Sequence, residues 1–388
     1  MKTSTDRILT THVGSLVRPP EIVAAMRAKA SGQPLPDADF APALKNAVDT
    51  IVKRQADIGI DVPSDGECSK ISFAGYVSDR LSGFEMRETP AGESPINNFG
   101  RDHEAFADFY AEYDAAPVSG GRMRVVCASP IEQVGQALIQ RDIDNLRAAT
   151  VNAGVQEAFI PSVAPATVEG QRINEFYSTE EEYLFTIADA MRVEYKAIVD
   201  AGFLLQIDDP RIVATYDLMN PAPSIADYRK FAEMRVEAIN HAIGDIPADR
   251  IRYHLCWGSW HGPHSTDLPL KDIVGIVLKI KAGALSFEAA NARHEHEWKV
   301  WEDTKLPAGM VLIPGGGGHA ANTVEHPELV AQRLTNFARL VGRENVIAGT
   351  DCGFSQGSLN PRVHASIMWA KLAALVEGAQ IASKQLWS

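Results

Sequence analysis

The chain has 388 residues, of which 45% are hydrophobic and 22% are charged, and its formal net charge is −13 at pH 7. This composition is typical of a soluble globular protein, and the length allows one large α/β domain or two ordinary ones. The acidic balance argues against a nucleic-acid-binding protein, which needs a basic surface, and no apolar run is long enough to span a membrane.

The N-terminus and the cysteines indicate the compartment. The first twelve residues, MKTSTDRILTTH, lack the apolar core of a signal peptide. Four cysteines, Cys68, Cys127, Cys256 and Cys352, show no spacing typical of a disulfide framework. We therefore expect a reduced, cytoplasmic protein, in which cysteines more often bind metal or catalyse.

Eight short apolar segments, most of them ending in polar or small residues, predict β-strands. In chain order they cover residues 8–14, 61–67, 156–164, 204–210, 251–257, 284–290, 310–316 and 346–352. Helical patterns alternate with them. The sequence therefore predicts an α/β fold, a (β/α)8 TIM barrel formed by a single domain over residues 1–388, with a doubly wound sheet as the main alternative.

Two of the predicted helices have clear ends. Ser178 and Glu181 form a capping-box pattern, which predicts the start of a helix that ends at Gly202. Pro327 predicts the start of a second helix, which Gly342 ends.

One stretch, residues of about 80–130, does not fit the alternation. It is rich in Gly, Pro, Asn and aromatic residues and contains one extra strand, predicted at 124–129. We interpret it as an insertion after the second strand that covers one mouth of the barrel.

Four residues from distant parts of the chain predict a zinc site. His254 and Cys256 are two residues apart in a strand, so their side chains point to the same face. Glu288 and Cys352 each lie near the end of another strand, and in a barrel the carboxyl ends of the strands meet at the active site. Two thiolates, one imidazole and one carboxylate suit Zn²⁺, which takes four such ligands tetrahedrally.

Further polar residues follow other strands. Glu67 comes after a glycine that lets the backbone approach a ligand, and Asp208 ends the strand of QIDDP. We expect both acids to bind a positively charged group such as an amine, although acids in such places also cap helices or hold loops. His319 follows the glycines 315–318, which lack the Lys and Ser/Thr of a P-loop, and is predicted to donate a proton near the metal; the alternative is an incidental histidine in a flexible loop.

Four other histidines do not form the H-E-x-x-H motif of zinc proteases. We expect them at the surface or beside the ligands rather than on the metal: His261, His264, His294 and His296.

The predicted ligand set indicates the chemistry. Two cysteinates make zinc less electrophilic and so a poorer activator of water, but well suited to hold an incoming thiol as its reactive thiolate. A free thiol with a pKa near ~8.5 is mostly protonated at pH 7. The set therefore predicts S-alkylation, in which a thiol attacks a carbon atom of a second substrate.

The chain resembles the cobalamin-independent methionine synthase family, specifically its catalytic C-terminal barrel, over nearly its whole length. The shared landmarks are THVGS near the start, DGE at 65–67, QIDDP at 206–210, HLC at 254–256, FE at 287–288 and DCG at 351–353. Two family positions differ, since Asp65 stands where the family has His and Gly317 where it has Asp.

The resemblance implies a (β/α)8 barrel with zinc on His254, Cys256, Glu288 and Cys352. It also implies that homocysteine is bound by the backbone of Val13, Gly14 and Ser15. The family's amine-binding acids correspond to Glu67 and Asp208, and its proposed proton donor to His319. The predicted function is thus zinc-dependent methyl transfer to homocysteine or a related thiol.

We expect a small-molecule thiol and an alkyl donor as partners, neither nucleic acid nor a membrane, and homo-oligomerisation is left open. The nearest alternative is a transferase that joins an epoxyalkane to coenzyme M, with Arg18, Lys70 or Arg80 binding the sulfonate. A metal-free decarboxylase resembling uroporphyrinogen decarboxylase and a non-catalytic zinc-binding or thiol-sensing protein are alternatives of other classes.

Overall fold

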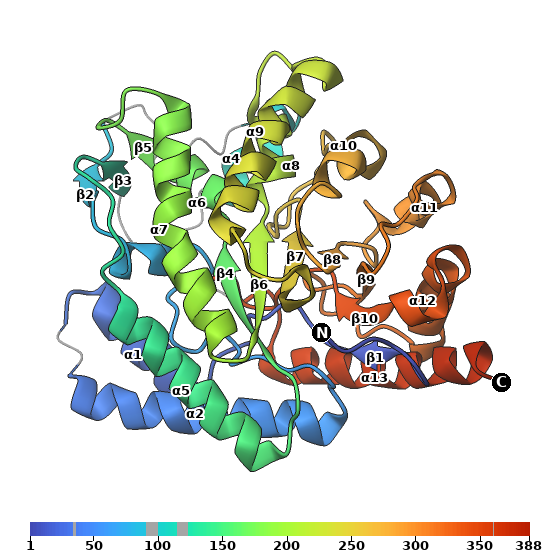
Figure 1. The fold of residues 1–388 in the computed structure, drawn as a ribbon. Coiled ribbons are helices and arrows are strands. Elements are labelled where there is room, and N and C mark those ends of the chain that lie inside the picture. The colour runs from blue at the N-terminus through green and yellow to red at the C-terminus, as the bar shows by residue number, and fades with distance from the viewer. Residues whose placement is uncertain (34–35, 91–99, 115–122, 360) are drawn as a thin grey trace.

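Seven parallel strands form one curved sheet at the centre of the computed structural model, which describes residues 1–33, 36–90, 100–114, 123–359 and 361–388. Helices surround this sheet (Figure 1). In sheet order the strands are β1 (Leu9–Thr10), β10 (Ile347–Thr350), β9 (Val311–Gly317), β8 (Ala284–Phe287), β7 (Ile251–Leu255), β6 (Leu204–Asp209) and β4 (Phe159–Val163).

Residues 61–67 take the eighth position, between the two edge strands β1 and β4. Val62 pairs in parallel with Thr11, which follows β1, and Ser64 pairs in parallel with Phe159 of β4. The predicted (β/α)8 barrel is therefore confirmed, although the second predicted strand is reduced to two single bridges. The first is also shorter than predicted, covering only Leu9–Thr10.

The helices follow the strands and cover the outside of the barrel (Figure 1). They are α1 (Pro20–Ala30), α2 (Asp37–Ile58), α5 (Gln136–Ala153), α6 (Pro165–Gly170), α7 (Glu180–Asp200), α8 (Arg211–Leu218), α9 (Ile225–Ile243), α10 (Leu270–Val277), α11 (Val300–Asp303), α12 (Pro327–Val341) and α13 (Ala365–Leu386). Strands β4 and β6 to β10 are buried along their whole length, as expected when helices cover one face and side chains fill the interior.

The predicted ends of α7 and α12 can be compared with the structure. The capping residue of α7 is Thr179, whose side chain accepts a hydrogen bond from the Glu182 N–H, while Glu182 accepts one from the Ser178 N–H. The predicted Ser178–Glu181 pair is therefore wrong by one residue. Helix α12 begins at Pro327 and ends at Val341 before Gly342, as predicted.

The stretch predicted as an insertion contributes β2 and β3 to a second, small sheet. Strand β2 (Phe84–Glu88) is antiparallel to β3 (Met123–Cys127), which pairs in parallel with β5 (Ile173–Asn174). The extra strand predicted at 124–129 is thus Met123–Cys127. Two short helices, α3 (Arg101–Ala105) and α4 (Ala107–Asp114), lie between β2 and β3 in the sequence.

Parts of the stretch, residues 91–99 and 115–122, lie outside the described residues. Within the described ranges, none of the helices combines the length and hydropathy needed to cross a bilayer. The organisation of residues 1–388 as a single domain stays a prediction.

Candidate metal centre

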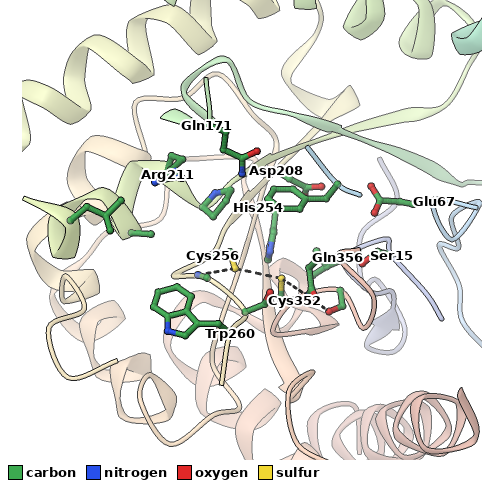
Figure 2. Close-up of a pocket in the computed structure, with 18 of the residues that line it drawn as sticks. Ser15, Glu67, Gln171, Asp208, Arg211, His254, Cys256, Trp260, Cys352 and Gln356 are labelled. Atoms are coloured by element: carbon green, nitrogen blue, oxygen red, sulfur yellow. Dashed lines mark hydrogen bonds between the residues drawn. The ribbon is translucent and has the colours of Figure 1, made fainter. Parts of the chain in front are cut away.

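Three of the predicted ligands converge at the carboxyl ends of the barrel strands. The ligand atoms of His254, Cys256 and Cys352 lie within 4.8 Å of one another, and the two sulfurs are 3.5 Å apart (Figure 2). His254 is in β7, Cys256 directly follows it, and Cys352 follows β10. Strand geometry brings His254 and Cys256 to one face, and barrel curvature brings β10 opposite them.

The donor atoms of this group fit a borderline-soft cation such as zinc. All three side chains are buried. His254 Nδ1 is 3.2 Å from Ser286 Oγ, which fixes the ring, and Nε2 has no hydrogen-bond partner among the described residues. A buried nitrogen without a partner, beside two thiols, is the arrangement expected of a metal ligand oriented by a second hydrogen bond.

The electrostatics of the group favour one thiolate even without a metal. The hydrogen bond from Cys256 lowers the pKa of Cys352, with further help from His254 and His319, and the same bond, together with burial, raises the pKa of Cys256. Burial lowers the pKa of His254, but contact with Cys352 and the charges of Asp208 and Glu288 outweigh it and raise that pKa. The two opposite shifts therefore favour ionisation of Cys352 over that of Cys256.

Glu288, the fourth predicted ligand, is not among the ligand atoms that lie within 4.8 Å of one another. Its Oε1 accepts a hydrogen bond of 2.9 Å from the Trp257 N–H. Its Oε2 accepts from Asn291 Nδ2 at 2.7 Å and from Arg293 Nη2 at 2.6 Å. The structure therefore brings together three of the four predicted ligands, while the carboxylate is satisfied by protein donors.

Arg293, which binds Glu288, belongs to a network that includes two of the four other histidines. Arg293 also pairs with Asp267 at 2.8 Å, and His264 and His294 both contact that carboxylate. These partners lower the pKa of Asp267 to about 2 against the opposing effect of burial. Of the four histidines expected beside the ligands or at the surface, His264 and His294 are buried and His261 and His296 are exposed.

The two acids predicted to bind an amine are both buried. Asp208 is the register partner of His254 on the neighbouring strand, and burial raises its pKa to about 7. Glu67 pairs with Lys70 at 3.2 Å through Oε1, whereas Oε2 is buried with no hydrogen-bond partner among the described residues. The backbone φ of Glu67 is 56°, a left-handed conformation that costs a non-glycine residue free energy and is often kept at functional sites.

Contacts with buried residues fix the conformation of the turn at Val13 to Ser15. Gly14 has a φ of 130°, and a Cβ there would lie 2.4 Å from Pro161 Cγ, so only glycine fits. The Gly14 N–H donates to His12 Nδ1 at 3.1 Å, while His12 Nε2 is 2.6 Å from Gln55 Oε1. Burial lowers the pKa of His12 to about 4, so the ring is neutral and accepts from Gly14.

A cavity of about 290 Å³ connects these residues. Val13, Ser15, Glu67 and Asp208 line it together with the three predicted ligands. The side chains of Glu67, Asp208, His254 and both cysteines surround it in Figure 2. His319 is absent from the lining; it is buried after β9, and neither ring nitrogen has a hydrogen-bond partner among the described residues.

Another part of the cavity wall is aromatic and was not predicted. It includes His103 and Tyr110 from α3 and α4, stacked at 3.6 Å, and Trp260 from the loop after β7, which donates to the Tyr110 hydroxyl at 3.1 Å. Asp102 holds these two segments together, because it accepts hydrogen bonds from the backbone of His264 and Ser265. The only signal in the sequence was the aromatic content of the predicted insertion.

Three polar lining residues were also missed. Gln171 directly follows α6, Arg211 is the first residue of α8, and Gln356 lies four residues after Cys352 (Figure 2). Nothing in their local sequence distinguishes them from ordinary polar loop residues, because only the fold brings them to the cavity.

The three cationic side chains predicted to bind a sulfonate instead bind groups of the protein itself. Arg18 donates to the carbonyls of Glu67, Lys70 and Ser355. Lys70 donates to Glu67 and the Pro161 carbonyl, and Arg80 pairs with Asp142 and Glu194. Arg18, Lys70 and Arg80 are therefore internal structural cations.

Comparison with known proteins supports the resemblance. No protein-family model matches the chain. The methionine synthase of Sulfurisphaera tokodaii is 24% identical over 380 residues, which cover 97% of this chain and 93% of the relative. That of Thermococcus kodakarensis is 25% identical over 380 residues, 97% of this chain and 94% of the relative.

A solved structure of a B12-independent methionine synthase from Shewanella sp. W3-18-1, in complex with selenomethionine, has the same fold. Its TM-score is 0.74 at 18% sequence identity, over 98% of this chain and 99% of that one. The barrel fold, the residues at the strand ends and the names of the relatives all support the same family resemblance. The predicted resemblance of this chain to the cobalamin-independent methionine synthase family is therefore confirmed over nearly its whole length.

Proposed function

We propose that this chain is a zinc-dependent methyltransferase that methylates the sulfur of homocysteine and so forms methionine. The observation that carries this proposal is the group of His254, Cys256 and Cys352 in a cavity that also contains two buried carboxylates. The names of the relatives support the same reaction. Zinc held by the three residues would keep the incoming thiol as thiolate at neutral pH.

The remaining residues have distinct proposed roles. Glu67 and Asp208 bind the substrate ammonium, since both line the cavity that contains the sulfurs and Glu67 Oε2 has no hydrogen-bond partner among the described residues. The backbone at Val13, Gly14 and Ser15 binds the amino-acid end of the substrate. Glu288 is the proposed fourth ligand, since its charge acts on both His254 and Cys256. To bind the metal, its carboxylate would give up a hydrogen bond from Asn291 or Arg293.

The transfer itself is a displacement at carbon. The substrate thiol releases its proton to solvent, its sulfur attacks the methyl carbon, and the bond between that carbon and the donor breaks with its electron pair leaving on the donor. We propose that His319 protonates the departing donor. Its burial next to Asp351 and Cys352, with two nitrogens free of hydrogen bonds among the described residues, supports that role.

Metal analysis combined with the variants Cys256→Ser and Cys352→Ser tests the proposal. We expect bound zinc in the purified protein, and a loss of zinc affinity and of methyl transfer of roughly a hundredfold or more in each variant, because direct ligands matter more than their hydrogen-bonding neighbours. Cys127→Ser, a buried thiol outside the cavity, is the matched control. Full zinc content and activity in both ligand variants would refute the proposal.

A coenzyme M transferase remains the closest rival. The three cations predicted for a sulfonate are engaged by internal partners, and among the described lining residues Arg211 is the one Lys or Arg side chain. We therefore expect homocysteine, and not coenzyme M, to perturb the spectrum of cobalt-substituted protein. A protein without metal would instead favour the decarboxylase alternative.

A further inference from the structure

Each sulfur of the cluster accepts a hydrogen bond from a nitrogen of its own loop. The Gly258 N–H donates to Cys256 Sγ at 3.3 Å, and Gln356 Nε2 donates to Cys352 Sγ at 3.5 Å. The dashed lines around the two sulfurs in Figure 2 mark their contacts. Cys352 and Gln356 both line the cavity, so this hydrogen bond lies where an alkyl donor would approach.

The two donors differ in kind. Gly258 donates from the backbone at a φ of 98°, and a Cβ there would lie 2.1 Å from Trp260 Cζ3, so the loop fixes this N–H. Gln356 donates from a side chain whose Nε2 also donates to the Gly353 carbonyl. That second bond holds the amide in one orientation, with both amide hydrogens used.

An enzyme that methylates a bound thiol must spare its own thiolates. Methylation of Cys352 would form a bond from Sγ to the methyl carbon while the carbon–donor bond breaks, with the electron pair leaving on the donor. The product is a neutral thioether, which is a poor ligand for zinc. Hydrogen bonding to a thiolate stabilises its charge, and a more stabilised thiolate is a weaker nucleophile.

We propose that Gln356 is a specificity-determining residue, whose amide protects Cys352 from alkylation so that the methyl group goes to the substrate sulfur. This inference rests on the proposed function for its purpose, but the hydrogen bond and its effect on Cys352 can be tested without any substrate. Cys256 is an internal reference, because its donor is backbone and is unaffected by a change at position 356.

The test uses methyl iodide as a small electrophile on zinc-loaded protein. A sulfur–methyl bond forms, the carbon–iodine bond breaks and iodide leaves, and peptide mass spectrometry measures the ratio of methylated Cys352 to methylated Cys256. In Gln356→Met and Gln356→Leu, which lack the N–H, we expect this ratio to rise about three- to tenfold. Gln171→Met is the matched control, since Gln171 lines the same cavity and makes no hydrogen bond to either sulfur among the described residues.

The two variants separate hydrogen bonding from space. Methionine keeps the unbranched shape of glutamine whereas leucine is shorter and branched, so a rise in Gln356→Leu alone would mean that the changed shape, and not the lost N–H, exposes Cys352, and would overturn the inference. An unchanged ratio in both variants, or an equal rise in Gln171→Met, would also overturn it. Zinc content, measured first, identifies any variant that has lost the site.

The outcome is distinguishable from failure of the proposed function. If the wild-type protein binds zinc and makes methionine while the ratio stays constant in the Gln356 variants, the function stands and the inference fails. If the ratio rises but no thiol is methylated in the assay, the protective contact stands and the proposed substrate pair fails.

Discussion

The two walls of the cavity are built differently. One wall consists of barrel residues, with His254 in β7, Asp208 in β6 and both cysteines just beyond strand ends. The other consists of aromatic side chains from α3, α4 and the loop after β7, among them Tyr110 and Trp260. The barrel wall is fixed by strand register, whereas the aromatic wall depends on contacts such as Asp102 with the backbone of His264.

This difference suggests that the two walls bind different substrates. Rigid elements hold catalytic atoms more accurately than loops do, and loops vary more readily with the ligand. On the proposed function, the barrel wall would hold the thiol and the metal, which the reaction always needs. The aromatic wall would face the methyl donor, and changes in each wall should therefore affect different kinetic constants.

After the two cysteine variants, the largest expected effect is in Asp208→Asn, also on the barrel wall. This variant keeps the shape of the side chain but removes a charge proposed to bind the substrate ammonium. We expect kcat/KM for the thiol to fall about ten- to a hundredfold with zinc content unchanged, the usual effect of losing one charged hydrogen bond. Glu67 is less suitable, because its removal would also leave Lys70 buried without its carboxylate.

Steady-state kinetics with varied thiol and a zinc assay check this expectation, and Asp245→Asn, on the exposed surface, is the control. An unchanged kcat/KM in Asp208→Asn would remove the acid from the proposed substrate site and weaken the division between the walls.

The second effect concerns the stability of the barrel wall. The pKa of His12 is about 4 in the folded protein and ~6.5 when unfolded, so below pH ~6.5 the unfolded chain binds the extra proton first. The stabilisation by neutral His12 is complete above pH ~6.5 and is lost as the pH falls toward 4. Between pH 7 and pH 5 this group should lose about 2 kcal/mol of stability.

His12→Asn keeps an acceptor for the Gly14 N–H but does not titrate. The free energy of unfolding in urea, measured at pH 7 and pH 5, should therefore decline less in the variant than in the wild type, while His364→Asn, at an exposed histidine, declines like the wild type. Equal declines in His12→Asn and the wild type would show that His12 is not the group responsible.

The smallest effect is expected on the aromatic wall, in Trp260→Leu. The loss of one aromatic contact should raise KM for the methyl donor about three- to tenfold and leave zinc binding and KM for the thiol unchanged. Trp387→Leu, at the end of α13 and away from the cavity, is the control. A larger effect on the thiol than on the donor would contradict the proposed assignment of the two walls.

The sequence predicted the barrel wall better than the aromatic wall for a physical reason. His254 and Cys256 share a face because strand residues alternate, and their convergence with Cys352 follows from the shared edge of parallel strands. Tyr110 and Trp260 are 150 residues apart in the sequence and meet through a side-chain hydrogen bond. No local periodicity encodes such a contact.

Other differences follow the same logic. Residues 61–67 satisfy few ladder hydrogen bonds, because the chain turns at Gly66 and Glu67 with positive φ angles, so the predicted strand is only two bridges. The orientation of Glu288 depends on Arg293, Asn291 and the Trp257 N–H, and a spacing pattern cannot reveal which donors a carboxylate will choose.

Arg18 restricts the relative movement of two loops of the barrel wall. One guanidinium joins the carbonyls of Glu67 and Lys70 to that of Ser355, three residues after Cys352. The loop that carries an acid and the loop that carries a sulfur are thus clamped as one unit. The fold therefore sets the distance between the Glu67 carboxylate and the Cys352 sulfur. A molecule that binds both groups must have a matching length.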